Sequence, residues 1–166
     1  MTATLQRWRR PTLPGLLLGI LTMAAGLLAA PSAAQAGAGD PVYIYQNQGT
    51  NRCLEDSFNN GLRTYPCDSN KGNPQRWRVH SWADGTVRLQ NVYTAHCLDD
   101  TFDFGLRTWD CNDGENQSWW VVYWGDETRR FQNQATGRCI EDSYVNGFRM
   151  ASNCDDSVWQ SWYKSV

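Results

Sequence analysis

The sequence of 166 residues has few aliphatic side chains, few histidines and no excess of positive charge. Residues 37–166 contain 16 Leu, Ile and Val residues against 20 Phe, Tyr and Trp residues. The same stretch carries 17 acidic and 12 basic residues, so its net charge is about −5. A protein that binds nucleic-acid phosphates needs a basic surplus, and we therefore expect no nucleic-acid partner.

Patterns typical of catalysis and of metal binding are also missing. His80 and His96 are the two histidines, and neither has further ligands nearby in sequence, so we expect no metal and no cofactor. There is no G-x-S-x-G motif and no Cys–His pair with a free thiol. Adjacent acids such as Glu55 and Asp56 point to opposite faces of a strand, so they are not placed to flank one glycosidic bond. We therefore expect a protein that is not an enzyme.

The first 36 residues differ from the rest and have the pattern of a secretory signal peptide. Three arginines precede an apolar run, Leu16–Ala30, and the small residues of Ala34–Ala36 form a cleavage site. A retained membrane anchor is the alternative, but glycines interrupt the run and Pro31 follows it. We expect a secreted, extracellular chain that begins near Gly37 and does not insert into a membrane; export by the Sec or the twin-arginine route stays open.

Three repeats make up the rest of the sequence. Each opens on an apolar residue followed by Gln-Asn, contains two cysteines, and closes on Gln-x-Trp. The period of 44 and then 42 residues gives repeats at about 42–85, 86–127 and 128–166. A period of this length also fits a propeller blade, but closed propellers need roughly four to eight blades.

The cysteines recur with the repeats. Six cysteines allow 15 pairings, but each repeat has its own pair, 14 or 15 residues apart. We expect one disulfide hairpin per repeat: Cys53–Cys67, Cys97–Cys111 and Cys139–Cys154. Asn-Gly in the first and third repeats is a strong hairpin signal, and Phe104-Gly105 in the middle repeat is a weaker one. One extra residue between Arg149 and Cys154 predicts a bulge or a distorted turn there.

Local patterns indicate an all-β fold. Residues 42–47, 86–91 and 128–133 read as short strands, separated by Gly, Asn and Asp. The Gln-x-Trp tryptophans are expected in the core, and the Gln-Asn pairs are expected to satisfy backbone groups at strand ends. In each repeat an Asp precedes an Arg by seven residues, which predicts three cross-strand pairs: Asp56–Arg63, Asp100–Arg107 and Asp142–Arg149.

Each of the three repeats closes on Gln-x-Trp at the same phase, and in each the first cysteine is followed by Leu or Ile and then by an acid. In these features the repeats resemble the ricin B-type lectin domain. The resemblance covers Val42 to Val166. It implies a β-trefoil, with twelve strands, four per repeat, around a pseudo-threefold axis, as a single domain over residues 37–166. It also implies a carbohydrate partner, a galactose-type sugar or a xylan-like polysaccharide, bound in a shallow pocket of each repeat.

The pocket pattern of that family is met best in the middle repeat. The family has an Asp two residues after the first cysteine, an aromatic ring before the second, and Asn-Gln at the start of Gln-x-Trp. Asp99, Trp109, Asn116 and Gln117 hold these positions, and Arg107 stands where the family often has Gln. Carboxylates and amides suit sugar hydroxyls, and an aromatic ring suits the apolar face of a sugar.

The other two repeats depart from the pattern. In the first, Glu55 replaces Asp, Tyr65 is the expected platform, and Pro74 precedes Gln75 where the family has Asn. In the third, Glu141 is present but no aromatic residue stands at the platform position, so we expect no sugar site there.

Two functions are open from the sequence. The first is a monomeric, secreted, lectin-like module that binds carbohydrate chiefly through its middle repeat. The alternative is a trefoil that has lost sugar binding and serves as a protein-interaction or inhibitor module. The replaced Asp positions, Pro74 and the missing third platform favour the alternative.

Overall fold

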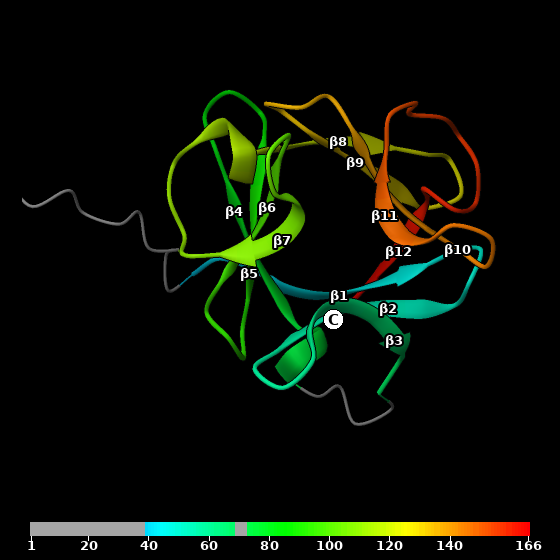
Figure 1. Cartoon of the computed structure of the whole chain (residues 1–166), viewed down its shortest axis with the longest axis horizontal. Helices are drawn as coiled ribbons and strands as arrows, with labels where there is room; N and C mark the ends of the chain where they lie inside the picture. Colours follow the sequence, from blue (N-terminus) through cyan, green and yellow to red (C-terminus); the bar gives the residue numbers. More distant parts are fainter. Residues whose placement is uncertain (1–38, 69–72) are drawn as a thin grey trace, which may run out of the picture. The chain divides into compact units, whose positions relative to one another are not determined.

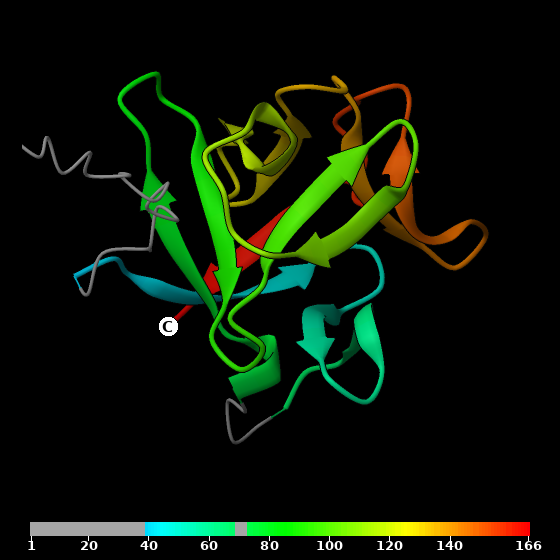
Figure 2. The same cartoon turned by 60° about the vertical axis from the view of Figure 1, so that its left-hand side comes forward.

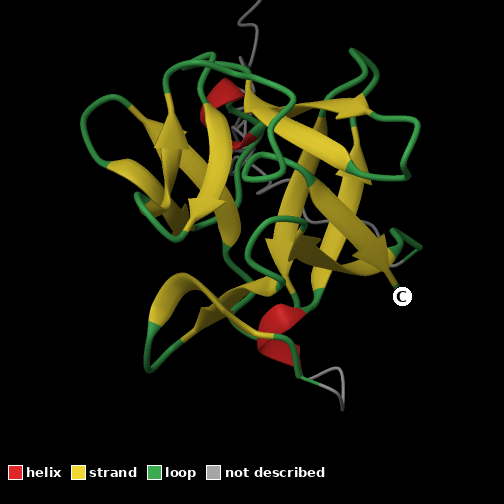
Figure 3. Cartoon of the chain, turned by 90° about the vertical axis from the view of Figure 1, so that its right-hand side faces the viewer, coloured by secondary structure: helices red, strands yellow, loops and turns green. Residues whose placement is uncertain are grey.

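The structure is a computed structural model that describes residues 39–68 and 73–166. The predicted signal peptide, residues 1–36, lies outside the described residues. Strands dominate, and the helices of this part of the chain are two single 3-10 turns, η1 (Asn73–Gln75) and η2 (Glu115–Gln117) (Figure 3). No helix in the described part is long and apolar enough to cross a membrane.

Twelve strands follow one another along the chain, four in each repeat (Figure 1). The first repeat contains β1 (Val42–Asn47), β2 (Arg52–Ser57), β3 (Gly61–Pro66) and β4 (Trp77–Ser81). The second contains β5 (Val87–Asn91), β6 (Cys97–Thr101), β7 (Gly105–Trp109) and β8 (Trp119–Tyr123). The third contains β9 (Arg129–Asn133), β10 (Cys139–Ser143), β11 (Gly147–Ala151) and β12 (Trp162–Ser165).

Six of these strands close into an antiparallel barrel. The pairs are β1–β4, β4–β5, β5–β8, β8–β9, β9–β12 and β12–β1, which completes the ring. The other six form the hairpins β2–β3, β6–β7 and β10–β11 at the end where β1, β5 and β9 leave the barrel. Figure 2 brings the β6–β7 hairpin to the front. This arrangement is the β-trefoil that the repeats predict.

The three Gln-x-Trp tryptophans lie at the centre of the fold. Trp77, Trp119 and Trp162 are at most 1% exposed. Each indole N–H donates a hydrogen bond to the carbonyl of the Leu or Ile that follows the first cysteine of its repeat. Those aliphatic side chains are buried in the same cluster. The core prediction is confirmed, and because each of these three indoles has a partner, a large ring fills the core without an orphaned donor.

The Gln-Asn pairs satisfy backbone groups, as predicted. The side-chain oxygen of Asn47 accepts hydrogen bonds from the N–H groups of Gly49 and Thr50, and its amide donates to the carbonyl of Trp159. The equivalent asparagines of the other two repeats make the same bonds. A side chain at Gly49 would overlap the Trp159 ring, so glycine is required there.

The predicted disulfides are all present, one in each repeat. All three hairpins turn at a glycine with positive φ: Gly61, Gly105 and Gly147. The middle hairpin therefore turns like the others although Phe104 replaces Asn, because the glycine alone meets the backbone requirement.

Of the two irregularities predicted between Arg149 and Cys154, a bulge or a distorted turn, the bulge is absent from the β10–β11 ladder, and the chain bends at Ser152 and Asn153 instead. β10 and β11 pair without interruption from Ser143–Gly147 to Cys139–Ala151. The extra residue lies after Ala151, between the end of β11 and Cys154. A loop accommodates an insertion without loss of ladder hydrogen bonds, whereas a bulge would break them.

The predicted cross-strand pairs were wrong by one residue. The turn places each arginine opposite the first acid of its hairpin: Glu55–Arg63, Asp99–Arg107 and Glu141–Arg149. Because neighbouring residues on a strand face opposite sides, a shift of one residue changes which acid the arginine meets. The arginines therefore pair with the acids of the candidate sugar pockets.

The second acid of each hairpin joins neighbouring repeats instead. Asp100 is fully buried and accepts hydrogen bonds from Thr136 Oγ1 and from the guanidinium of Arg138. Asp142 has equivalent Thr and Arg partners from the first repeat. These buried contacts fix the hairpins against one another.

The remaining junction is different. Asp56 is 1% exposed and accepts hydrogen bonds from Thr94 and Thr108, and His96 stands where the other two junctions have an arginine. The His96 ring instead packs 6.4 Å from that of Phe58, measured between ring centroids. All three junctions therefore have a buried aspartate that accepts a hydrogen bond from a threonine, but the junction at Asp56 lacks the arginine of the other two.

Replacing Arg138 with Ala should lower the free energy of unfolding by about 2 to 3 kcal/mol, because Asp100 would retain a buried charge without its cation. Arg138→His is the matched control, since it installs the residue that the second repeat has at this position, and it should cost less. Urea unfolding at neutral pH measures both. An Arg138→Ala loss no larger than that of Arg138→His would contradict the prediction.

Two turns at the opposite end of the barrel are each fixed by an aspartate. Asp84 accepts hydrogen bonds from the backbone N–H and the hydroxyl of Thr86. Asp126 accepts the same two bonds from Thr128. These bonds hold the pKa of both carboxyls below the usual 3.8. The bond from the backbone N–H of Thr86 has the largest effect on Asp84, and the bond from the Thr128 hydroxyl has the largest effect on Asp126.

Because these pKa values are lower in the folded state, both carboxylates stabilise the fold above about pH 4 and lose that effect as the pH falls through the folded values. The double variant Asp84→Asn/Asp126→Asn should therefore show a shallower fall in Tm between about pH 4 and pH 2 than the wild type. Thermal melts at successive pH values measure the two slopes, and equal slopes would show that these carboxylates do not contribute.

Candidate functional site

The candidate site of the middle repeat lies on the β6–β7 hairpin. Trp109 ends β7 and is 53% exposed, whereas Asp99 on β6 is 3% exposed. The register places Arg107 opposite Asp99, and Arg107 lies on the same face of β7 as Trp109 because the two are separated by a single residue. The Nε of Arg107 donates to Asp99 Oδ1 at 2.9 Å.

The guanidinium of Arg107 lies between two exposed aromatic rings. Its Cζ is 4.6 Å from the centroid of Trp109 and 4.5 Å from that of Phe104. Cation–π contacts on both sides, together with the Asp99 carboxylate, hold the arginine in one orientation. Phe104 was not among the predicted site residues; its place directly before the turn glycine was the available signal.

Gln117 holds the second carboxylate oxygen of Asp99. Its Nε2 lies 3.4 Å from Asp99 Oδ2 and donates at 2.9 Å to the carbonyl of Asp110. Its Oε1 accepts a hydrogen bond from the backbone N–H of Asn112. Gln117 is fully buried, so it positions the carboxylate and is not exposed to a ligand.

Asn116 precedes Gln117 in η2 and is half-buried. Its backbone carbonyl accepts a hydrogen bond from Asn133 Nδ2, which ties η2 to β9. The structure thus brings Asp99, Arg107 and Gln117 into one hydrogen-bonded set.

Arg107 and Trp109 are the parts of this set that reach solvent. The Arg107 side chain is 27% exposed and covers the nearly buried Asp99 carboxylate. A carboxylate oxygen accepts two hydrogen bonds, and each oxygen of Asp99 has one protein donor. The site therefore presents a planar ring and guanidinium donors to solvent, while the Asp99 carboxylate, 4% exposed, lies behind Arg107 with acceptor capacity left on both oxygens.

The first repeat has the same arrangement with one ring in place of two. Arg63 donates to Glu55 Oε1 through two nitrogens, at 2.6 and 2.8 Å, and its Cζ lies 4.1 Å from the centroid of Tyr65. Gln75 Nε2 donates to Glu55 Oε2 at 3.0 Å. Although Glu55 is longer than Asp, both of its oxygens are held, and Tyr65 is 49% exposed. Pro74 occupies the position of Asn116.

The third repeat lacks the ring. Glu141 is held by Arg149 and by Asn146, each at 3.0 to 3.1 Å. Ala151 occupies the position of Trp109, opposite the first cysteine of the repeat, and it is 4% exposed. Gln160 donates to the Asn153 carbonyl. In this repeat the acid and arginine are present, but Ala151 stands where the other two repeats have an exposed aromatic ring.

No group of three or more His, Cys, Asp and Glu side chains in residues 39–68 and 73–166 is arranged to hold a metal ion.

The ricin-type β-trefoil lectin domain matches residues 41–162 of this sequence. The chain belongs to this family. The family resemblance carried by the Gln-x-Trp repeats is therefore confirmed. No curated protein matches the sequence.

Solved structures with the same fold include proteins of several kinds. ThreeFoil, a designed threefold-symmetric protein, has a TM-score of 0.66 and 17% identity, covering 75% of this chain and 98% of its own. A Polyporus squamosus lectin bound to a human-type influenza-binding epitope has a TM-score of 0.61 and 14% identity. The match covers 77% of this chain and 49% of the lectin chain. An exo-β-1,3-galactanase of Clostridium thermocellum has a TM-score of 0.64 and 19% identity, covering 75% of this chain but 30% of its own.

Replacing Arg107 with Leu should lower the free energy of unfolding by about 2 to 3 kcal/mol, because a nearly buried carboxylate would lose its cation. Arg107→Lys keeps the charge but not the planar fork that lies between two rings, so its cost should be intermediate. Urea unfolding of the three proteins measures the order. If Arg107→Leu were as stable as the wild type, the ion pair would have no part in holding the site.

Proposed function

We propose that this protein is a secreted, monomeric, non-enzymatic lectin that binds a neutral galactose-type or xylan-like carbohydrate. The observation that carries the proposal is the exposed Trp109 ring beside Arg107, whose guanidinium is held by a nearly buried carboxylate. A flat ring next to fixed polar groups suits a sugar, which has one apolar face and hydroxyls at its edge. Membership of a lectin family and the sugar-bound Polyporus lectin of the same fold support it.

The residues of the middle repeat have separate roles in this proposal. Trp109 packs against the apolar face of the sugar, and Arg107 donates hydrogen bonds to its hydroxyls. Asp99 fixes Arg107 and accepts a hydrogen bond from a sugar hydroxyl, while Gln117 fixes Asp99 and Asn116 lies at the edge of the site. Because the charges of Asp99 and Arg107 offset each other, the site favours an uncharged ligand over an anion.

The first repeat supplies a second, weaker site made of Glu55, Arg63, Tyr65 and Gln75. A tyrosine offers a smaller ring than a tryptophan, and Asn60 stands at the position from which Phe104 covers Arg107 in the middle repeat. A polysaccharide that engages both repeats would be bound more tightly than a single sugar unit, because the second contact is intramolecular.

Three further features support the rest of the proposal. Three disulfides suit an oxidising, extracellular compartment. Two hairpins that repeat one arrangement of acid, arginine and exposed ring suit repeated binding, whereas catalysis needs one asymmetric set of groups. The exposed apolar residues are distributed over several hairpins, which suits a monomer.

Trp109→Ala should weaken binding about tenfold or more, since a stacked ring contributes on the order of 1 kcal/mol beyond its buried area. The test screens the oxidised protein on glycan and polysaccharide arrays, then measures the best ligand by calorimetry. Trp120→Ala is the control, because Trp120 is also exposed but lies on β8, away from the site. Asp99→Asn should weaken binding as well; unchanged binding in both site variants would refute the assignment.

The alternative function is a protein-interaction or inhibitor module. The absence of a ring at Ala151 and the proline at position 74 favour it, because both remove parts of the family's sugar pocket. No binding on the arrays, together with stoichiometric capture of one specific protein, would replace the lectin proposal with this one.

A further inference from the structure

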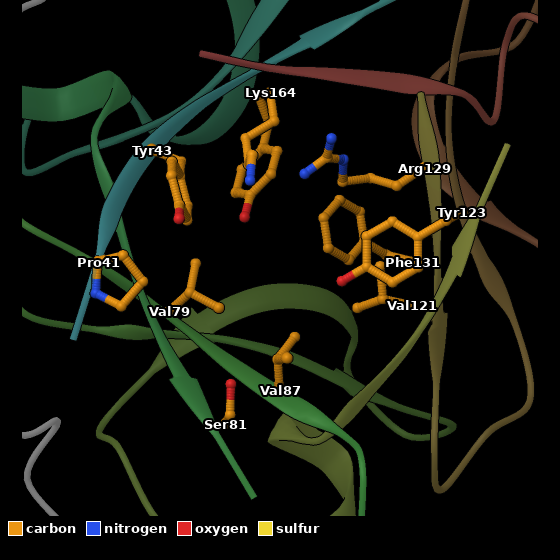
Figure 4. A pocket seen from close by; sticks show the side chains of 11 residues that line it. Pro41, Tyr43, Val79, Ser81, Val87, Val121, Tyr123, Arg129, Phe131 and Lys164 are labelled. Atoms are coloured by element: carbon orange, nitrogen blue, oxygen red, sulfur yellow. The ribbon is translucent and has the colours of Figure 1, made fainter. Parts of the chain in front are cut away.

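The barrel contains a cavity of about 160 Å³ at the end opposite the hairpins (Figure 4). All six barrel strands line it, through residues toward the starts of β1, β5 and β9 and toward the ends of β4, β8 and β12. We call this cavity the barrel mouth. The candidate sugar sites lie on the hairpins, so the barrel mouth is separate from them.

Two cationic side chains line the barrel mouth at positions where the other two repeats have uncharged residues, valine or tyrosine. Lys164 on β12 holds the place of Val79 on β4 and Val121 on β8, two residues after the Gln-x-Trp tryptophan. Arg129 on β9 holds the place of Val87 on β5, and of a tyrosine on β1. Both cations come from the third repeat, so charge is gathered on one side of the cavity.

Neither cation has an acidic partner in the described part of the chain. Arg129 is 8% exposed, and no carboxylate lies within 4.0 Å of it or of Lys164 there. One Arg129 nitrogen, Nη2, donates to the Glu127 carbonyl, while Nε is buried without a partner. Burying an unpaired cation is costly, and the valines of the other repeats show that the fold does not require it.

Aromatic side chains surround the two cations. The Lys164 ammonium lies 4.2 Å from the centroid of Tyr43, and Arg129 lies 5.7 Å from that of Tyr123. Figure 4 shows Arg129 extending toward the middle of the cavity between Lys164 and Phe131. Tyr45 also lines the cavity; burial raises its pKa well above the usual 10, so its hydroxyl remains a hydrogen-bond donor at neutral pH.

We propose that the barrel mouth binds a small organic anion, a carboxylate attached to a single ring. Cavities of about 150 Å³ hold a benzene ring, so the volume here accommodates one ring. The carboxylate receives charge-assisted hydrogen bonds from Arg129 and Lys164, and the ring packs against Val79, Val87 and Phe131. A bound carboxylate supplies the counter-charge that the protein does not provide.

The lining selects against two other anions. Most of its side chains are aliphatic or aromatic, so a polyhydroxy ring such as a uronate would lose hydration without regaining enough hydrogen bonds. Sulfate would pair with the cations but leave the apolar part of the cavity unfilled.

Calorimetric titration of the oxidised protein with benzoate tests the proposal. We expect a Kd of about 1 mM or tighter, a reachable value for so small a ligand. Benzyl alcohol, a neutral ring of similar size, should bind at least tenfold more weakly, as should glucuronate and sulfate. No benzoate binding would overturn the proposal, and equal binding of sulfate would reduce the cavity to an inorganic anion site and overturn the ring requirement.

Two variants locate the site. Arg129→Val and Lys164→Val each install a residue found at the same position in another repeat, and each should weaken benzoate binding at least tenfold. Lys164 is exposed, so its variant tests the site even if Arg129→Val were unstable. Trp109→Ala should leave benzoate binding unchanged, which separates this site from sugar binding. Wild-type affinity in Lys164→Val and in folded Arg129→Val would refute the assignment.

Discussion

Each of the three buried tryptophans ties a hairpin to the barrel. The indole of Trp119, on barrel strand β8, donates to the carbonyl of Leu98 on hairpin strand β6, and the other two repeats contain the same bond. The hairpins otherwise join the barrel strands through a single residue pair each. With so few aliphatic residues available, large rings with a satisfied N–H both fill the core and position the hairpins. The candidate sugar sites depend on this attachment.

The hairpins share a frame and differ at one exposed position. In each, an acid on the first strand faces an arginine on the second, and the residue two positions after the arginine lies beside it. That residue is Tyr65, Trp109 or Ala151. The residue at this position can therefore change from repeat to repeat while the strand register and the pairing of an acid with an arginine are kept. The barrel mouth shows the reverse case, in which two cavity-lining positions of one repeat carry a charge that the other repeats lack.

Much of this architecture could be predicted from the sequence because its signals are local. Repeated words at a constant spacing indicated the trefoil, the disulfides and the tryptophan core, since each repeat must bury the same face against its neighbours. The pairing of acids with arginines was mispredicted, because strand register depends on how many residues the turn contains. The role of Phe104 was missed for the same reason: its contact with Arg107 exists once the hairpin is closed.

The sequence by itself determined the family, the threefold repetition and the identity of the rings and acids available to each hairpin. The tertiary structure decided which of those groups meet. It placed Arg107 over Asp99 between two rings, and it turned Asp100 inward to a partner in the next repeat. It also brought Arg129 and Lys164, which are 35 residues apart, to one end of the barrel. Side-chain direction alternates along strands, so barrel closure and register settle these contacts, and neither can be read from residue types alone.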